Sequence, residues 1–171
     1  SRITRMDVVN ASMYDGGTAL AEAILMAAGI KKKNKVLIPE NINPRYFSIV
    51  ETYLSDAEID IVFLPCPNGI IDVSALKAKL DDSIAAVVMQ NPNYYGILEH
   101  AREISEVTHE NQSLLISSVD LTALSLITPP GDYDADIVVA EGQPFGISVN
   151  FGGPYLGVFA AKKEYIRKMP G

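Results

Sequence analysis

The chain has 171 residues, of which 48% are hydrophobic, so it is long enough to form one domain around a substantial core. Its formal net charge of −7, with one basic run at residues 31–33, excludes the positive surface that nucleic-acid binding requires. The single cysteine, Cys66, excludes an internal disulfide framework and a multi-thiolate metal site, and indicates a reducing, cytoplasmic compartment. No apolar run approaches the length of a membrane span, so no membrane segment is expected.

Apolar segments that alternate with turn residues predict an α/β domain with a mostly parallel sheet flanked by helices. Residues Thr18–Ala28 are almost wholly apolar, which predicts a buried helix capped by Thr18 or Asp15 and ended by Gly29. The lysines at 31–33 are interpreted as complementing the dipole of this helix. Further helices are expected at 43–54, 72–80, 100–110 and 164–168, and strands at 36–38, 59–64, 85–89, 114–116, 137–140 and 156–160.

Three polar loops follow predicted strands, at residues 90–96, 117–121 and 141–154. Open α/β sheets bind ligands at the carboxyl ends of their strands, so these loops predict a site at one edge of the sheet. The 141–154 loop is rich in glycine and proline, which lets the backbone approach a ligand closely. The alternative is a long hairpin or crossover whose glycines only turn the chain.

Two further features point to the same edge. Residues Asp15, Gly16, Gly17 and Thr18 precede the buried helix, and free amides at a helix start are suited to an anion. Neither a dinucleotide fingerprint nor a Walker loop is present, so this signal has low specificity. Asp120 follows an apolar strand and is placed to pair with a cationic ring nitrogen of a ligand; the alternative is a cap for the residues from Thr122 onward.

Metal binding is not expected. His100 and His109 lie nine positions apart, without a carboxylate or cysteine at ligand spacing. Asp132, Asp134 and Asp136 alternate before an apolar run, and a solvated turn explains them better than calcium because no EF-hand pattern follows.

The distribution of lysines limits the covalent chemistry. No lysine occurs from Leu80 through Ala161, the span that contains all three strand-end loops. Lys162 and Lys163 are adjacent, and a solvated helix start explains them more simply than a Schiff base.

Together, the segments Tyr14–Ala19, Asn91–Gly96, Gly142–Gly146 and Phe151–Pro154 resemble the glycine cleavage system P-protein, the decarboxylating glycine dehydrogenase, in its N-terminal half or alpha subunit (subunit 1). The resemblance covers nearly all of the chain but only the middle of that half. It implies that residues 1–171 form a single domain of a longer subunit, the large domain of the fold-type I pyridoxal-phosphate-dependent, aminotransferase-like fold.

The resemblance also implies an activity and partners. In this family glycine forms an aldimine, loses carbon dioxide and passes its aminomethyl group to the lipoyl group of the H-protein. The aldimine lysine belongs to the beta subunit, and alignment on the shared Gly-Gly-Pro puts Gln143 at the lysine position. Since glutamine cannot form an imine, no catalytic residue is expected in this half, which would support the beta-subunit site.

By the same resemblance, Asp120 falls where this fold holds the pyridinium nitrogen, and Asp15–Thr18 where it holds the phosphate. Both are expected to be vestigial, with pyridoxal phosphate held by the partner half and none in this chain. Asn91, Asn93, Tyr94 and Tyr95 are expected in a substrate or interface loop.

Two other functions stay open. One is a self-sufficient pyridoxal-phosphate transferase or decarboxylase whose lysine lies elsewhere or is Lys162 or Lys163. The other is a non-catalytic structural module that binds a phosphate-bearing ligand at Gly16 and Gly17.

Overall fold

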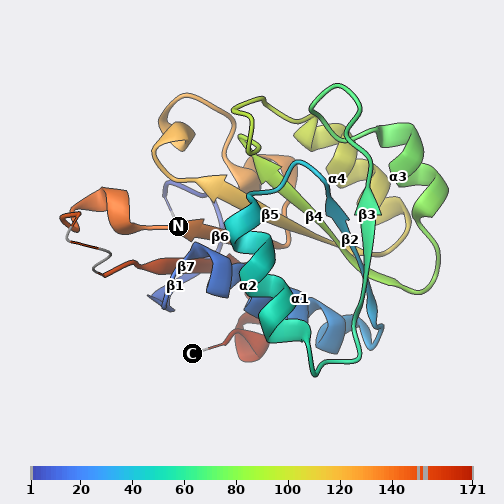
Figure 1. Ribbon diagram of the computed structural model, residues 1–171, viewed down its shortest axis with the longest axis horizontal. Coiled ribbons are helices and arrows are strands. Elements are labelled where there is room, and N and C mark those ends of the chain that lie inside the picture. Colours follow the sequence, from blue (N-terminus) through green and yellow to red (C-terminus); the bar gives the residue numbers. More distant parts are fainter. Residues whose placement is uncertain (1, 150, 152–153, 171) are drawn as a thin grey trace.

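The fold is built on one mixed sheet, described here by a computed structural model that covers residues 2–149, 151 and 154–170 (Figure 1). Within these residues seven strands pair in the order β1-β7-β6-β5-β4-β2-β3. The strands are β1 (Val8–Met13), β2 (Lys35–Pro39), β3 (Asp60–Leu64), β4 (Ile84–Asn91), β5 (Leu114–Asp120), β6 (Ile137–Glu141) and β7 (Gly157–Ala161). Strands β2 to β6 pair in parallel, whereas β7 is antiparallel to both β6 and β1. The predicted mostly parallel α/β sheet is therefore confirmed.

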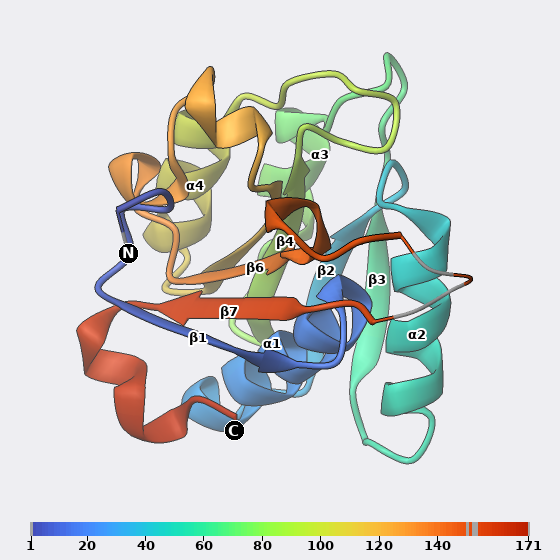
Figure 2. The same ribbon diagram turned by 90° about the vertical axis from the view of Figure 1, so that its left-hand side faces the viewer.

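Helices cover both faces of the sheet. They are α1 (Gly16–Lys31), α2 (Pro44–Leu54), α3 (Val73–Lys79) and α4 (Ala101–Glu110). Helices α1 and α2 lie on one face and α3 and α4 on the other, as the two perpendicular views show (Figures 1 and 2). This three-layer arrangement explains why the central strands β4, β5 and β6 begin with apolar residues and carry polar residues toward their carboxyl ends, because both faces of the sheet are covered there.

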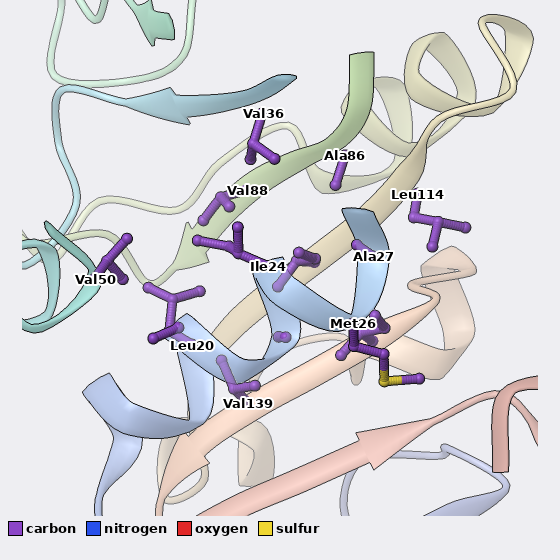
Figure 3. Close-up of a cluster of buried hydrophobic side chains, with 14 of the residues drawn as sticks. Leu20, Ile24, Met26, Ala27, Val36, Val50, Ala86, Val88, Leu114 and Val139 are labelled. Carbon is purple, nitrogen blue, oxygen red and sulfur yellow. The ribbon is translucent and has the colours of Figure 1, made fainter. Parts of the chain in front are cut away.

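Helix α1 is the centre of the first core. Leu20, Ile24 and Ala27 are fully buried and belong to one apolar cluster with Val88 of β4 and Val139 of β6 (Figure 3). A helix that is apolar on nearly all sides must be covered on nearly all sides, and here the sheet and α2 provide that cover.

The second core lies on the opposite face. Leu76 of α3 and Ile104 of α4 pack in one cluster with Leu37, Met89 and Leu115 of the sheet. Successive side chains of a strand point to opposite faces, so Leu37 belongs to this cluster while its neighbours Val36 and Ile38 belong to the first.

Several expected boundaries were wrong. Helix α1 continues past Gly29 to Lys31, and Lys32, with φ 54°, provides the left-handed C-cap instead. Lys31 lies in the last turn, in agreement with the dipole interpretation. Strand β5 continues through Ser117 and Ser118 to Asp120, and Lys163–Lys168 is a 3₁₀ helix rather than an α-helix.

Strand β1 was not predicted. Among the strands that the structure describes it pairs with β7 alone, and burial along it is intermediate at best because it lies at the edge of the sheet. An edge strand with polar Asn10 and Ser12 lacks the continuous apolar pattern that revealed the inner strands.

No helix in the described part of the chain is both long enough and apolar enough to cross a membrane.

Candidate functional site

A pocket of about 450 Å³ lies at the carboxyl edge of the sheet. Its lining comes from the carboxyl ends of β4, β5 and β6 and from the segments that follow β2, β4 and β6, including Tyr46, Asn93, Tyr94, Asp120 and Glu141. Asp120 and Glu141 are directly paired at the ends of β5 and β6. The strand-end loops thus meet at one pocket, in the place where parallel sheets bind ligands.

The helix start at this edge is occupied by carboxylates of the chain itself. Asp15 is the N-cap of α1, and its Oδ1 accepts a hydrogen bond of 2.7 Å from the backbone N of Thr18. Of the two caps expected, Asp15 is therefore correct. The backbone N of Gly16 donates to Oε2 of Glu141 at 3.1 Å. Amides that were expected to be available to an anion are already hydrogen-bonded.

Glu141 acts as an internal anion for three segments. Its Oε2 bonds the start of α1, while its Oε1 accepts from the backbone N of Gln143 at 2.9 Å and of Leu156 at 2.8 Å. The carboxylate therefore joins the helix start to both ends of the 141–156 loop. Bonds from backbone N–H groups to a charged carboxylate are among the stronger hydrogen bonds in proteins.

Close packing of α2 explains the two glycines at the helix start. A Cβ at Gly16 would lie 2.6 Å from Tyr46 Oη, and one at Gly17 would lie 2.6 Å from Ile49 Cδ1. Glycine at both positions leaves room for the side chains of α2 to pack on the helix start, with no ligand needed to explain it. Tyr46, which the sequence analysis missed, fills the space over the helix start.

The potential at this edge is negative. Burial, followed by the charges of Glu141, Asp15 and Asp120, raises the pKa of Tyr46 to about 12. The described residues that line the pocket include no lysine, arginine or histidine. A phosphate group in this pocket would meet two carboxylates and no cation, so the pocket lining does not fit a phosphate-bearing cofactor such as pyridoxal phosphate. Arg45 lines a separate pocket together with Asp15 and Thr18.

Asp120 caps the turn that follows β5. Its Oδ1 accepts from the backbone N of Thr122 at 2.8 Å, from Thr122 Oγ1 at 2.5 Å and from the backbone N of Ala123 at 3.3 Å. Burial would raise the pKa of Asp120, but the hydrogen bonds from Thr122 and Ala123 outweigh it and lower the pKa. The capping alternative therefore describes this structure, and the ring-nitrogen role stays a prediction.

Gln143 lies in a short 3₁₀ helix, Gln143–Phe145, directly after β6. Its Nε2 donates to the backbone O of Ile147 at 2.5 Å, so its side chain closes its own loop. The adjacent Pro144 lines the pocket together with Asp120, which places this loop at the expected edge. Gly152 and Gly153, which carried the alignment of Gln143 with a lysine, lie outside the described residues, so that alignment stays a prediction.

The loop after β4 presents two tyrosines to solvent. Tyr94 and Tyr95 are 53% and 63% exposed, and their rings meet edge to face with centroids 5.8 Å apart. Asn91 and Asn93 are buried beneath them and hydrogen-bonded. Their bonding partner Glu99, also buried, was not identified from the sequence.

Lys162 lies at the opposite edge of the sheet. It follows β7, which runs antiparallel to β6, and its Nζ bonds Asp136 Oδ1 at 2.6 Å and Asp134 Oδ1 at 2.9 Å. Lys162 stands at a helix start as expected, because it is the N-cap of the Lys163–Lys168 helix, but its ammonium is held in ion pairs rather than solvated. That position also separates it from the carboxyl-edge pocket.

Asp136 is not part of a solvated turn. It is 3% exposed, and its Oδ2 lies 2.7 Å from His109 Nε2 and accepts from the backbone N of Leu115 at 2.8 Å. The expectation of a solvated turn holds for Asp132 and Asp134, which are exposed, and fails for Asp136 because the partners that bury this carboxylate are distant in sequence. No group of three or more histidine, cysteine or acidic side chains in the described part of the chain is arranged to hold a metal ion.

Comparison with known proteins identifies the family. The family model "Glycine cleavage system P-protein" matches residues 1–171. The chain belongs to the glycine cleavage system P-protein family. A relative from Geobacillus sp. (strain WCH70), "Probable glycine dehydrogenase (decarboxylating) subunit 1", is 46% identical over 169 residues, which are 99% of this chain and 38% of the relative. The chain thus spans well under half the length of such P-protein subunits.

Solved structures confirm the fold. A crystal structure of an inhibitor-bound glycine decarboxylase (P-protein) superimposes with a TM-score of 0.92 at 35% identity, covering 99% of this chain and 38% of that one. The sphingosine-1-phosphate lyase of Burkholderia pseudomallei shares the fold alone, with a TM-score of 0.72 at 13% identity over 97% of this chain and 42% of that one. The large domain of the fold-type I pyridoxal-phosphate-dependent enzymes, expected from the resemblance, is therefore the fold of this P-protein chain.

Proposed function

We propose that this chain is part of the first subunit of a heteromeric decarboxylating glycine dehydrogenase, in which it is the half without the Schiff-base lysine. It packs on the second subunit and completes that subunit's site. The whole enzyme decarboxylates glycine and passes the aminomethyl group to the lipoyl group of the H-protein. The name "subunit 1" of its relatives supports a partner subunit.

The observation that carries this proposal is the carboxylate at the helix start. Glu141 bonds the backbone N of Gly16, in the turn where the fold is expected to bind a phosphate. The fold of a cofactor enzyme is thus present while its anion site holds an anion of the chain itself. We infer that pyridoxal phosphate is held by the partner half and that this chain binds none.

The self-sufficient enzyme is the second candidate, and the position of Lys162 weighs against it. An ammonium paired with Asp134 and Asp136 at the far edge is neither near the pocket nor available as a nucleophile. The self-sufficient enzyme then requires a lysine elsewhere in the longer subunit, and experiment must test that version of the second candidate.

The charges at the carboxyl edge of the sheet weigh against the third candidate, a phosphate-binding module. Glu141 and Asp120 are the charged groups of the pocket in the described residues, and both repel phosphate.

Mixing the two full-length subunits tests the proposal. We expect glycine decarboxylation, measured as release of labelled carbon dioxide with H-protein present, from the mixture and from neither subunit alone. Full activity of the second subunit by itself would show that this half is not needed. Full activity of the first subunit by itself would favour the self-sufficient enzyme.

A further inference from the structure

One buried carboxylate gathers several donors at the carboxyl edge. Glu99 is 7% exposed, and its Oε1 accepts from Asn41 Nδ2 at 2.6 Å and from Asn93 Nδ2 at 2.8 Å. Its Oε2 accepts from the backbone N of Ile71 at 2.9 Å. The backbone N of Glu99 in turn donates to Asn91 Oδ1 at 3.1 Å. This carboxylate is held by amides from several segments of the chain.

These segments are the loops that follow three neighbouring strands. Asn41 follows β2, Ile71 follows β3, and Asn93 follows β4, and the three strands are adjacent in the sheet. Gly69 in the loop after β3 belongs to the same set of contacts, because its carbonyl O accepts from both Asn41 Nδ2 at 3.0 Å and Asn93 Nδ2 at 2.7 Å. We call this set of hydrogen bonds around Glu99 the junction. Glu99 is therefore the side chain on which three loops converge.

The junction leaves an acceptor without a partner. No ion pair to Glu99 exists within the described residues, so amides alone satisfy its buried carboxylate. Both bonds of the Asn41 amide use Nδ2, and Asn41 Oδ1 is the buried side-chain atom of the described residues that lacks a hydrogen bond. If the Asn41 amide were flipped, its Oδ1 would face the oxygens of Glu99 and Gly69, which cannot donate a hydrogen bond. These acceptors therefore fix the orientation of the Asn41 amide.

The junction sets the wall of the pocket. Asn93 Oδ1 accepts from the backbone N of Tyr95 at 3.0 Å and of Ile97 at 3.1 Å, which folds the loop around Asn93. The backbone N of Tyr94 donates to the carbonyl O of Asn41 at 3.0 Å. Asn93 and Tyr94 both line the pocket. The chain of contacts thus runs from Glu99, through two asparagines, to the pocket wall.

We propose that Glu99 is a positioning residue, which holds Asn93 and Tyr94 in the wall that this half contributes to the site shared by the two subunits. The role in the shared site rests on the proposed function. Glu99 has no exposed surface of its own at the pocket, so it acts through the loop and is not a catalytic residue.

The first arm of the test uses isolated full-length subunit 1 and amide hydrogen exchange. Glu99→Gln keeps the side chain's shape but replaces one acceptor oxygen by a donor, so it cannot accept all three bonds. We expect exchange at Tyr95 and Ile97 to become about tenfold faster, with β4 unchanged, because the loop opens locally. Glu103→Gln, the same change at an exposed position of α4, should alter neither. Unchanged exchange at Tyr95 and Ile97 in folded Glu99→Gln overturns the proposal, whatever the activity of the complex.

The second arm uses the reconstituted pair of subunits and a double-mutant cycle. Glu99→Gln should lower kcat/KM for glycine about tenfold per folded complex, whereas in a Tyr94→Ala background it should change kcat/KM less than about twofold, because the wall it positions is already lost. A purely structural role would give equal losses in both backgrounds and contradict the proposal, as would full activity of Glu99→Gln.

Outcomes of the two arms separate the two proposals. A wild-type pair no more active than the second subunit alone refutes the proposed function and with it the role in a shared site, while the exchange arm still decides whether Glu99 holds the loop. If Glu99→Gln fails to fold, Asn41→Ala removes one donor of the junction and its unpartnered oxygen, and both arms are repeated with it. The same accelerated exchange and the same non-additivity are then expected, and their absence contradicts the proposal.

Discussion

At the scale of single residues, carboxylates of the chain itself bond the backbone at the start of α1. Glu141 accepts hydrogen bonds from Gly16, Gln143 and Leu156, and Tyr46 packs over the helix start. Each of these contacts is satisfied without a ligand. The pocket beside them is lined by the carboxylates of Asp120 and Glu141, which would repel a phosphate group.

Restoring a lysine tests whether the pocket survives. We expect Gln143→Lys to fold but to bind pyridoxal phosphate weakly or not at all, because Asp120 and Glu141 repel the phosphate. Removing one of these charges in Glu141→Gln/Gln143→Lys should tighten binding about tenfold, the effect of roughly 1.4 kcal/mol. Visible absorbance during cofactor titration measures both. Tight, stoichiometric binding by Gln143→Lys alone would show a cofactor site disabled by one residue.

Asp136 should make stability dependent on pH in the acid range. Burial opposes its ionisation, but hydrogen bonds from His109, Lys162 and Leu115 outweigh burial and lower its pKa. A carboxyl group whose pKa is lower in the folded state stabilises the fold above its unfolded pKa, and that contribution is lost as the pH falls through the folded pKa. We therefore expect the melting temperature to fall as the pH is lowered below about 5.

Replacing Asp136 by asparagine isolates the contribution of this carboxylate to stability. At pH 7, Asp136→Asn should lower the free energy of unfolding by roughly 1–3 kcal/mol, since the charged acceptor of three donors is lost and the partners are partly screened by solvent. Its melting temperature should also depend less on acid pH than that of the wild type. Exposed Asp82→Asn serves as control, and an equal pH dependence in Asp136→Asn would assign the effect to other carboxyl groups.

At the scale of elements, burial decided what the sequence could predict. The inner strands β4 and β6 are apolar up to their carboxyl ends because helices cover both faces, and their pattern predicted them. Edge strand β1 is half-covered and mixed in polarity, so no pattern revealed it. Contacts between distant segments were equally hidden: Glu141 to Gly16 and Glu99 to Asn41 join residues that no local pattern relates.

Two glycines of α1 should respond in opposite ways to alanine. Gly16→Ala places a Cβ 2.6 Å from Tyr46 Oη and should destabilise the fold by about 1–3 kcal/mol through overpacking. Gly29→Ala meets nothing within 4 Å in a helical, exposed position and should stabilise by about 0.5–1 kcal/mol. Urea unfolding of both variants measures the difference. If Gly16→Ala raised the free energy of unfolding, the close packing of α2 against the helix start would be contradicted.

At the scale of the whole molecule, the sequence predicted the edge of the sheet that holds the candidate site, because the carboxyl ends of parallel strands must meet there. It also brought Asp15, Asp120 and Glu141 to that edge, but it did not predict that Glu141 would accept a hydrogen bond from the start of α1. Aromatic side chains of the loop after β4, Tyr94 and Tyr95, are also exposed at the pocket. Exposed aromatic side chains gathered near a site are typical of a surface that a partner covers.

Locating the cofactor in the assembled enzyme tests the central claim most directly. The two full-length subunits are combined with pyridoxal phosphate, reduced with borohydride, and mapped by mass spectrometry for the lysine that carries the label. We predict label on the second subunit alone, at about one group per pair of chains, because this half presents carboxylates where a phosphate would bind. Stoichiometric label on this subunit, at Lys162 or at any other lysine, would contradict the claim that it is the half without the chemistry.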